Sequence, residues 1–292
     1  MTTPDLHINP LPDPGSASRA RWLDALALAG LAGFVLALFG RLVFTNRVLA
    51  TGDVWTYFTP YRDFAAAALR SGHLPLWNPY LFLGAPFLAN SQAAVFYPLH
   101  WPLAWLSSAR AIVWSMVLHA WLGGAFTYGW LRKGLGLRPL AAWLGGVVFA
   151  GSGFIGGHVG QINQLNAYAW FPALLWALSS LQAPTRAWFV RPWQRTRLAR
   201  AAASALKPAA VIGAIFALQL FAGHTQAWYI SAIGAGLYAL AASFSAVRLT
   251  RRAPLIASAL SFYSFVTRAW PLLILTLGLM IGLGLAAVQL LP

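Results

Sequence analysis

Residues 52–102 read GDVWTYFTPYRDFAAAALRSGHLPLWNPYLFLGAPFLANSQAAVFYPLHWP and form the longest stretch between two apolar segments of the chain. The stretch carries Asp53 and Asp63, the only carboxylates after Asp24. Glutamate is absent from the whole chain, so any carboxylate chemistry has to use aspartate. The surrounding sequence predicts a membrane frame that holds this stretch at one face of a bilayer.

The composition is that of a membrane protein. Of the 292 residues, 59% are hydrophobic and only 9% are charged, whereas soluble domains carry roughly 25% charged residues. The net charge of +15 does not indicate a nucleic-acid partner, because the basic residues form short clusters between apolar segments. The absence of cysteine excludes disulfides and thiolate metal sites.

Apolar segments divide the chain and predict an all-α integral membrane protein with about seven transmembrane helices. The first segment has about 23 residues, enough to cross a hydrocarbon core of about 30 Å, and reads as an anchor rather than a cleaved signal peptide. Residues 1–21 are predicted to be a disordered cytoplasmic tail, residues 22–292 a polytopic membrane domain, and residues 255–268 a short interfacial helix. The predicted spans are 22–44, 112–131, 140–155, 167–181, 208–222, 227–244 and 270–291.

The basic residues predict the orientation in the membrane. With the N-terminus in the cytoplasm, 15 of the 20 Lys and Arg residues fall on the inner side, including a basic loop over residues 182–207. Three polar segments then share the outer face, namely the large loop (45–110), residues 157–167 and residues 223–226. We expect these segments to lie close together.

The large loop is expected to begin with a helix. Asp53 suits an N-cap for a helix that starts at residue 54, and Pro60 predicts a kink or a restart with Thr59 as cap. Gly72 is expected to end the helix. One face of this helix carries Tyr57, Tyr61, Phe64 and Ala68. A helix with such an aromatic face beside a membrane is expected to lie in the membrane interface.

Asp53 is the main candidate for chemistry. At the point where the chain leaves the first span, its carboxylate can act as a general base, or bind Mg²⁺ or Mn²⁺ that neutralises a phosphate leaving group. The alternative is an ordinary helix cap. Asp63 follows Arg62, and the two can form an exposed surface ion pair or contribute to substrate binding.

Two glycine–histidine elements are candidates for substrate binding. His158 and Gln161 follow one glycine pair, and His224 and Gln226 follow Gly223. Such groups at membrane depth are costly unless they line a cavity, where histidine can donate to a phosphate or a sugar hydroxyl. The alternative is a pair of histidines at glycine-capped helix ends. The spacing does not predict a zinc site.

Aromatic residues of the large loop allow two interpretations. The side chains of Trp77, Asn78, Trp101 and Trp105 can contact a sugar ring or lie in the aromatic belt of the membrane. The chain has no phosphate-binding glycine loop and no nucleotide fingerprint. Any sugar donor is therefore expected to be lipid-borne.

The motifs of the loop and of the glycine–histidine elements closely resemble those of the bacterial YfhO-type membrane proteins. The resemblance covers residues 22–292, and this chain would correspond to an N-terminal portion of the longer family members. The matching patterns are Gly52-Asp53, Tyr57-x-x-Pro60-x-x-x-Phe64, Gly72-x-Leu74-Pro75-Leu76-Trp77-Asn78-Pro79-Tyr80, Leu83-Gly84-Ala85-Pro86, Ala89-Asn90-x-Gln92, Phe96-Tyr97-Pro98, Gly157-His158, Trp170-Phe171-Pro172, Ala222-Gly223-His224-Thr225-Gln226 and Gln289-Leu290-Leu291-Pro292.

This family is similar to the GT-C glycosyltransferases, which take sugars from polyprenyl-phosphate carriers at the extracytoplasmic face. The resemblance implies that Asp53 is the acidic catalytic residue or metal ligand, and that a divalent cation is a possible cofactor. Val54 follows it in place of the second acid found in many of those enzymes. Arg62 or Arg70 would hold the donor phosphate, and the histidine and glutamine elements would line the cavity.

The resulting functional prediction is sugar transfer from a polyprenyl-phosphate donor to a cell-envelope acceptor. The implied location is the bacterial cytoplasmic (inner) membrane, with membrane lipids and the lipid-linked donor as partners. The alternative is a non-enzymatic transporter, lipid-handling protein or scaffold. Transporters often carry paired repeats, and this chain holds no second copy of the large loop.

Overall fold

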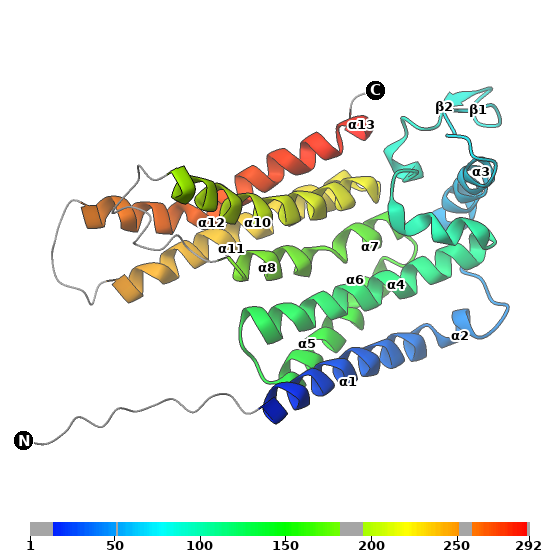
Figure 1. Cartoon of the computed structure of the whole chain (residues 1–292). Helices are drawn as coiled ribbons and strands as arrows, with labels where there is room; N and C mark the ends of the chain where they lie inside the picture. Colours follow the sequence, from blue (N-terminus) through cyan, green and yellow to red (C-terminus); the bar gives the residue numbers. More distant parts are fainter. Residues whose placement is uncertain (1–13, 51, 182–194, 251–258, 291–292) are drawn as a thin grey trace, which may run out of the picture.

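A computed structural model describes residues 14–50, 52–181, 195–250 and 259–290. These residues are mostly helical, with one short hairpin (Figure 1). The α-helices are α1 (Pro14–Leu38), α2 (Gly40–Val43), α3 (Thr59–Arg70), α4 (Ser108–Gly129), α5 (Pro139–Ala150), α6 (Gly153–Gly157), α7 (Ile162–Tyr168), α8 (Phe171–Ser179), α10 (Arg195–Phe221), α11 (Thr225–Thr250), α12 (Ala259–Leu285) and α13 (Ala287–Leu290).

Within the described residues, four helical segments are long and apolar enough to cross a membrane, namely Ser18–Leu38, Ser108–Gly134, Pro139–Gly157 and Thr225–Phe244. They coincide with four of the predicted spans. The predicted span 167–181 is not one helix, because the chain breaks between α7 and α8. Predicted spans 208–222 and 270–291 overlap shorter apolar segments, Ala205–Phe221 and Ala269–Leu285.

Three local predictions are corrected by the structure. Helix α1 begins at Pro14, so residues 14–21 are helical rather than part of a disordered tail; proline at a first helical position suits a helix start. Helix α10 begins at Arg195 and takes up much of the predicted basic loop, whose residues 182–194 lie outside the described part. Residues 259–268 continue into α12 instead of forming a separate interfacial helix.

The helices stack side by side around two apolar cores (Figure 1). One core joins α1, α4 and α5 around Leu31, Val35 and Met116. The other joins α8, α10, α11 and α12 around Leu174 and Phe216. Glycines let α10 and α12 approach closely: a Cβ added at Gly278 would lie 2.6 Å from the Ile212 side chain.

The large loop gathers at the end of the stack opposite the start of α1 (Figure 1). It opens with a single π-helical turn, η1 (Val54–Phe58), and α3 restarts directly after it, with Pro60 in its first turn. The prediction of a change near Pro60 agrees with the start of α3 at Thr59, but Thr59 is the first residue of α3 and not its cap, because Phe58 holds the cap position and no side chain caps the helix. The predicted cap is wrong, because the Asp53 side chain makes no capping hydrogen bond.

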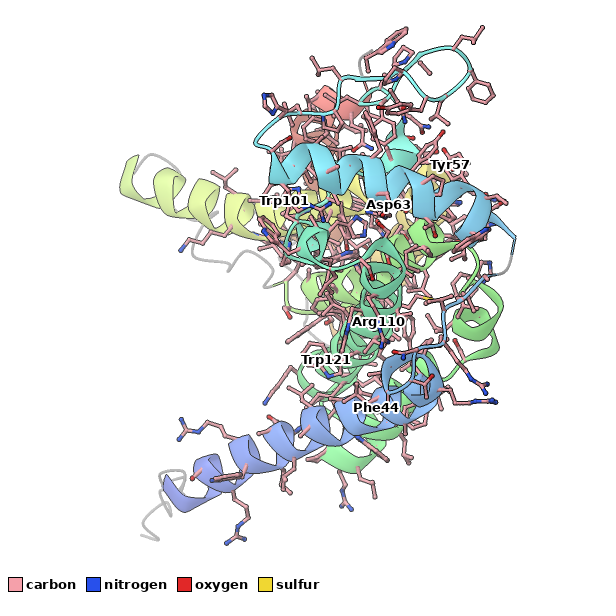
Figure 2. The ribbon with its side chains drawn as sticks, turned by 90° about the vertical axis from the view of Figure 1, so that its right-hand side faces the viewer. Phe44, Tyr57, Asp63, Trp101, Arg110 and Trp121 are labelled. Atoms are coloured by element: carbon pink, nitrogen blue, oxygen red, sulfur yellow. The ribbon has the colours of Figure 1, made fainter. Side chains whose placement is uncertain are left out.

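A short hairpin follows α3, with β1 (Trp77–Asn78) pairing antiparallel to β2 (Ala85–Pro86). Three 3₁₀ turns then lead to α4, namely Ser91–Ala93, Pro98–His100 and Pro102–Trp105. When the molecule is viewed from this end, α3 lies across the ends of the long helices (Figure 2).

The aromatic face of α3 packs inside the loop. Tyr61 and Phe64 lie against Phe87, with ring centroids 5.3 and 4.9 Å apart. Tyr57 stacks on Tyr61 at 4.1 Å. Side chains from the loop itself therefore cover part of this face, and the location of the helix in the membrane interface stays a prediction.

Candidate functional site

The three polar segments predicted to share one face meet at this end of the stack. Asp53 Oδ2 accepts a hydrogen bond from Gln161 Nε2 at 2.8 Å, which joins the start of the loop to the segment before α7. Gly223 has a φ of +86°, and an added Cβ would lie 2.4 Å from the Ser91 carbonyl oxygen. Only glycine allows this approach between residues 223–226 and the loop.

The Asp53 carboxylate is exposed and free of cations within salt-bridge distance. In the described parts of the chain, the ion pairs within 4 Å are those of Asp24 with Arg132 and Lys133, at the other end of α1 and α4. The partner of Asp53 is the neutral Gln161 amide. An exposed carboxylate held by one amide keeps its other oxygen available to a substrate.

The two predicted histidines are close enough to interact electrostatically. His158 Nδ1 lies 2.7 Å from the Phe154 carbonyl oxygen, and its ring stacks on Phe154 at 4.1 Å. His224 Nδ1 accepts the Ala227 amide proton at 3.1 Å, so neutral His224 carries its own proton on Nε2. Burial, and then the charge of His158, lower the pKa of His224. His224 is therefore neutral at pH 7 and can donate from Nε2.

Arg62 points away from Asp63 into the protein. Its Nη1 donates to His100 Nδ1, and its Nη2 donates to Asn163 Oδ1 at 3.2 Å. Because a guanidinium can only donate, His100 accepts at Nδ1 and is neutral. Burial lowers the pKa of Arg62 to about 10, so the guanidinium remains charged at neutral pH.

Polar groups from three elements surround this arginine. His100 Nε2 lies 3.0 Å from the side-chain amide of Asn166 and 3.4 Å from Ser115 Oγ. Asn163 Nδ2 donates to the Gln92 carbonyl at 2.6 Å. We call this set the Arg62 network; it comprises Arg62, Gln92, His100, Ser115, Asn163 and Asn166.

A second chain of hydrogen bonds runs beside the Arg62 network. Trp170 Nε1 donates to the Tyr97 hydroxyl at 2.8 Å, and that hydroxyl lies 2.5 Å from His119 Nε2. His119 Nδ1 donates to the Ser115 carbonyl at 2.7 Å. Tyr97 and His119 are fully buried, so this chain fixes the loop on α4 and leaves no group open to a substrate.

The remaining predicted residues lie apart from Asp53 or are held by their own neighbours. Asp63 accepts a hydrogen bond from the Ser108 hydroxyl and forms no ion pair with Arg62. Arg70 Nη1 donates to the Ala104 carbonyl at 2.8 Å.

Two further predicted residues belong to the hairpin and one to α11. Asn78 is 4% exposed and accepts from the Tyr80 amide at 2.9 Å, so it stabilises a turn and is not open to a substrate. Trp77 is 55% exposed, and Gly84 lies directly against its ring. Gln226 is exposed at the start of α11, beside an apolar groove between α11 and α12.

Asp53 can help to bind a cation only if most of the other ligands come from water or from a substrate. In the described ranges, no group of three or more His, Cys, Asp or Glu side chains is placed to hold a metal ion. Mg²⁺ commonly binds through one or two carboxylates, water and substrate phosphates. Asp53 supplies one such carboxylate.

Sequence reasoning missed the buried part of this region. His100, Asn163 and Asn166 sit in turns or short helices that carry no recognisable motif. Ser115 and His119 did give a signal, because two polar residues four apart lie on one face of an otherwise apolar span.

The long apolar helices indicate an integral membrane protein. No protein-family model matches this chain, and comparisons with curated proteins and with solved structures likewise give no match. The resemblance to YfhO-type proteins stays a prediction from the motifs.

Proposed function

We propose that this chain is a multi-pass protein of the bacterial cytoplasmic membrane that transfers a sugar from a polyprenyl-phosphate donor to a cell-envelope acceptor. In this proposal the N-terminus is cytoplasmic and the large loop lies on the outer face, as in GT-C enzymes. About seven spans are reached when the broken segment formed by α7 and α8, together with α10 and α12, is added to the four long apolar segments. Helices α10 and α12 have 27 residues each, about 40 Å at 1.5 Å per residue.

The observation that carries the proposal is the setting of Asp53. Its carboxylate is exposed where three polar segments meet, and its side-chain partner is the Gln161 amide. A general base needs an ionised, accessible oxygen within reach of the acceptor hydroxyl. Gln161 holds one carboxylate oxygen and leaves the other open.

The proposed reaction is a displacement at the anomeric carbon of the donor sugar. Asp53 accepts the proton of the acceptor hydroxyl while that oxygen forms the new bond to the anomeric carbon. The bond between the anomeric carbon and the phosphate oxygen breaks, and polyprenyl phosphate leaves with the electron pair. His224 Nε2 would donate a hydrogen bond to the phosphate or to a sugar hydroxyl, and His158 Nε2 would accept one from a sugar hydroxyl, because the His158 Nδ1 proton is donated to the Phe154 carbonyl.

Arg62 would act behind the site. Its guanidinium holds Asn163, two residues from the Gln161 that holds Asp53. This arrangement supports a positioning role for Arg62. A bound Mg²⁺ or Mn²⁺ would be held by Asp53 and would supply charge neutralisation of the phosphate.

The test follows labelled sugar from a polyprenyl-phosphate donor pool into acceptor, using the full reading frame purified in detergent. Asp53→Asn is expected to lower transfer by about 100-fold or more, because it removes the base. Asp13→Asn makes the same chemical change within residues 1–21 and is expected to leave transfer unchanged. Full transfer by Asp53→Asn would refute the catalytic role.

The same assay separates the alternatives. If EDTA inhibits the wild type, Asp53 is interpreted as a metal ligand. If EDTA has no effect, Asp53 is interpreted as a general base that acts without a metal. Donor binding without transfer, unaffected by Asp53→Asn, would instead indicate a lipid-handling or transport protein.

A further inference from the structure

The Arg62 side chain is partly buried, and its guanidinium has no carboxylate partner within the described residues. Its two hydrogen-bond acceptors are a neutral imidazole and an amide oxygen. The adjacent carboxylate in sequence, Asp63, is held by the Ser108 hydroxyl. An uncompensated charge inside a protein is costly, so such a group calls for a counter-charge.

The hydrogen-bonding capacity of Arg62 is also incompletely used. A guanidinium has five N–H donors, and acceptors within the described residues take up two of them. Both of these acceptors are neutral: Asn163 offers an amide oxygen, and His100 carries a single proton, because it accepts from the guanidinium. Donors therefore remain for a further acceptor that carries negative charge.

A cavity lies beside the Arg62 side chain. It has a volume of about 30 Å³ and is lined by Arg62, His100, Ser108 and Ser115 together with apolar side chains of α3 and α4. One water needs about 10–15 Å³ on this measure, so the space corresponds to about two water molecules or one ion of similar size. A tetrahedral phosphate with four oxygens does not fit.

We infer that this cavity is a binding site for a small monovalent anion of the size of chloride. The anion would accept the remaining N–H groups of Arg62, and the surrounding apolar side chains would favour a weakly hydrated ion over a strongly hydrated one. Its charge would offset that of the guanidinium and so stabilise the attachment of the large loop to α4 and α7. This inference does not depend on glycosyl transfer.

The test measures thermal unfolding of the full chain in detergent, with sodium chloride or bromide replacing sodium gluconate at constant ionic strength. We expect the unfolding midpoint to rise with halide concentration and to saturate, as ligand binding to the native state requires. Arg62→Gln is expected to abolish this response. Arg70→Gln, on the exposed end of the same helix, is expected to retain it.

Two further measurements keep the inference testable if Arg62→Gln does not fold. Asn163→Asp places a carboxylate at the atom that accepts from Arg62 and is expected to remove the halide response while supplying the counter-charge. Wild-type crystals soaked in bromide are expected to show an anomalous peak in contact with Arg62. The inference is overturned by no difference between halide and gluconate, by a response that survives in Arg62→Gln, or by an empty bromide map, each of which would leave only water in the cavity.

Discussion

Replacing Asn163 by alanine gives the sharpest test of how the large loop is held. Asn163 is 2% exposed and makes two hydrogen bonds, one from the Arg62 guanidinium at 3.2 Å and one to the Gln92 carbonyl at 2.6 Å. A hydrogen bond to a charged group contributes about 1.5–3 kcal/mol, and a neutral one about 1 kcal/mol. Asn163→Ala should therefore lower the free energy of unfolding by about 3 kcal/mol, roughly a hundredfold in the unfolding equilibrium.

The assay is denaturant unfolding of the purified protein in detergent micelles, followed by tryptophan fluorescence. Gln226→Ala, at an exposed position, serves as the control and should change stability by less than about 0.5 kcal/mol. Hydrogen exchange should increase in residues 52–102 before it increases in α10–α12, because the lost bonds join the loop to α7. A loss below about 0.5 kcal/mol for Asn163→Ala, or exchange that rises first in α10–α12, would refute the reasoning.

Three further variants test the site, the pH response and the hairpin. Gln161→Glu places a second carboxylate within hydrogen-bond distance of Asp53, so Mn²⁺ binding measured by electron paramagnetic resonance should tighten at least tenfold; unchanged binding would show that the two side chains do not share a site. Burial, and then the charge of the adjacent guanidinium, hold the pKa of His100 well below its usual value of 6.5. The unfolded chain therefore binds a proton first on acidification, and stability should fall as the pH drops below about 6.5; His100→Gln should flatten that slope, and an equal slope in both proteins would contradict the pKa shift. Gly84→Ala should loosen the hairpin, because φ is +117° and the added Cβ would lie 2.7 Å from the Trp77 ring; faster proteolysis between residues 74 and 90 checks this, and wild-type protection would argue against it.

Several features of the fold follow from local sequence. The apolar segments near residues 22–44, 112–131, 140–155 and 227–244 predicted helices that the structure contains, because helix formation in such segments needs no partner. Pro60 predicted a change in the helix at this point, and α3 begins at Thr59 with Pro60 in its first turn. The break between α7 and α8 was missed, because hydropathy averaged over a window does not register a short turn.

The candidate site was likewise predictable from the sequence only in part. The sequence identified Asp53, Gln161 and both histidines by their position at the ends of apolar segments. In the structure, Gln161 donates a hydrogen bond to Asp53, and His158 is close enough to His224 to interact with it electrostatically. The sequence also predicted roles for Arg62 as a phosphate clamp and for Asp63 as its neighbour. The direction of the Arg62 side chain was not predictable, because it depends on partners about 40 and 100 residues away.

The sequence by itself determined the membrane character, the long apolar helices and the restart of α3, because each depends on residues close together in the chain. Only the tertiary structure decided that the aromatic face of α3 is covered by Phe87, that Arg62 lies inside the protein without a carboxylate, and that His100 and Asn163 hold it. Those features arise when the large loop folds onto the helix ends. Long-range packing, and not local propensity, sets which polar groups are then buried together.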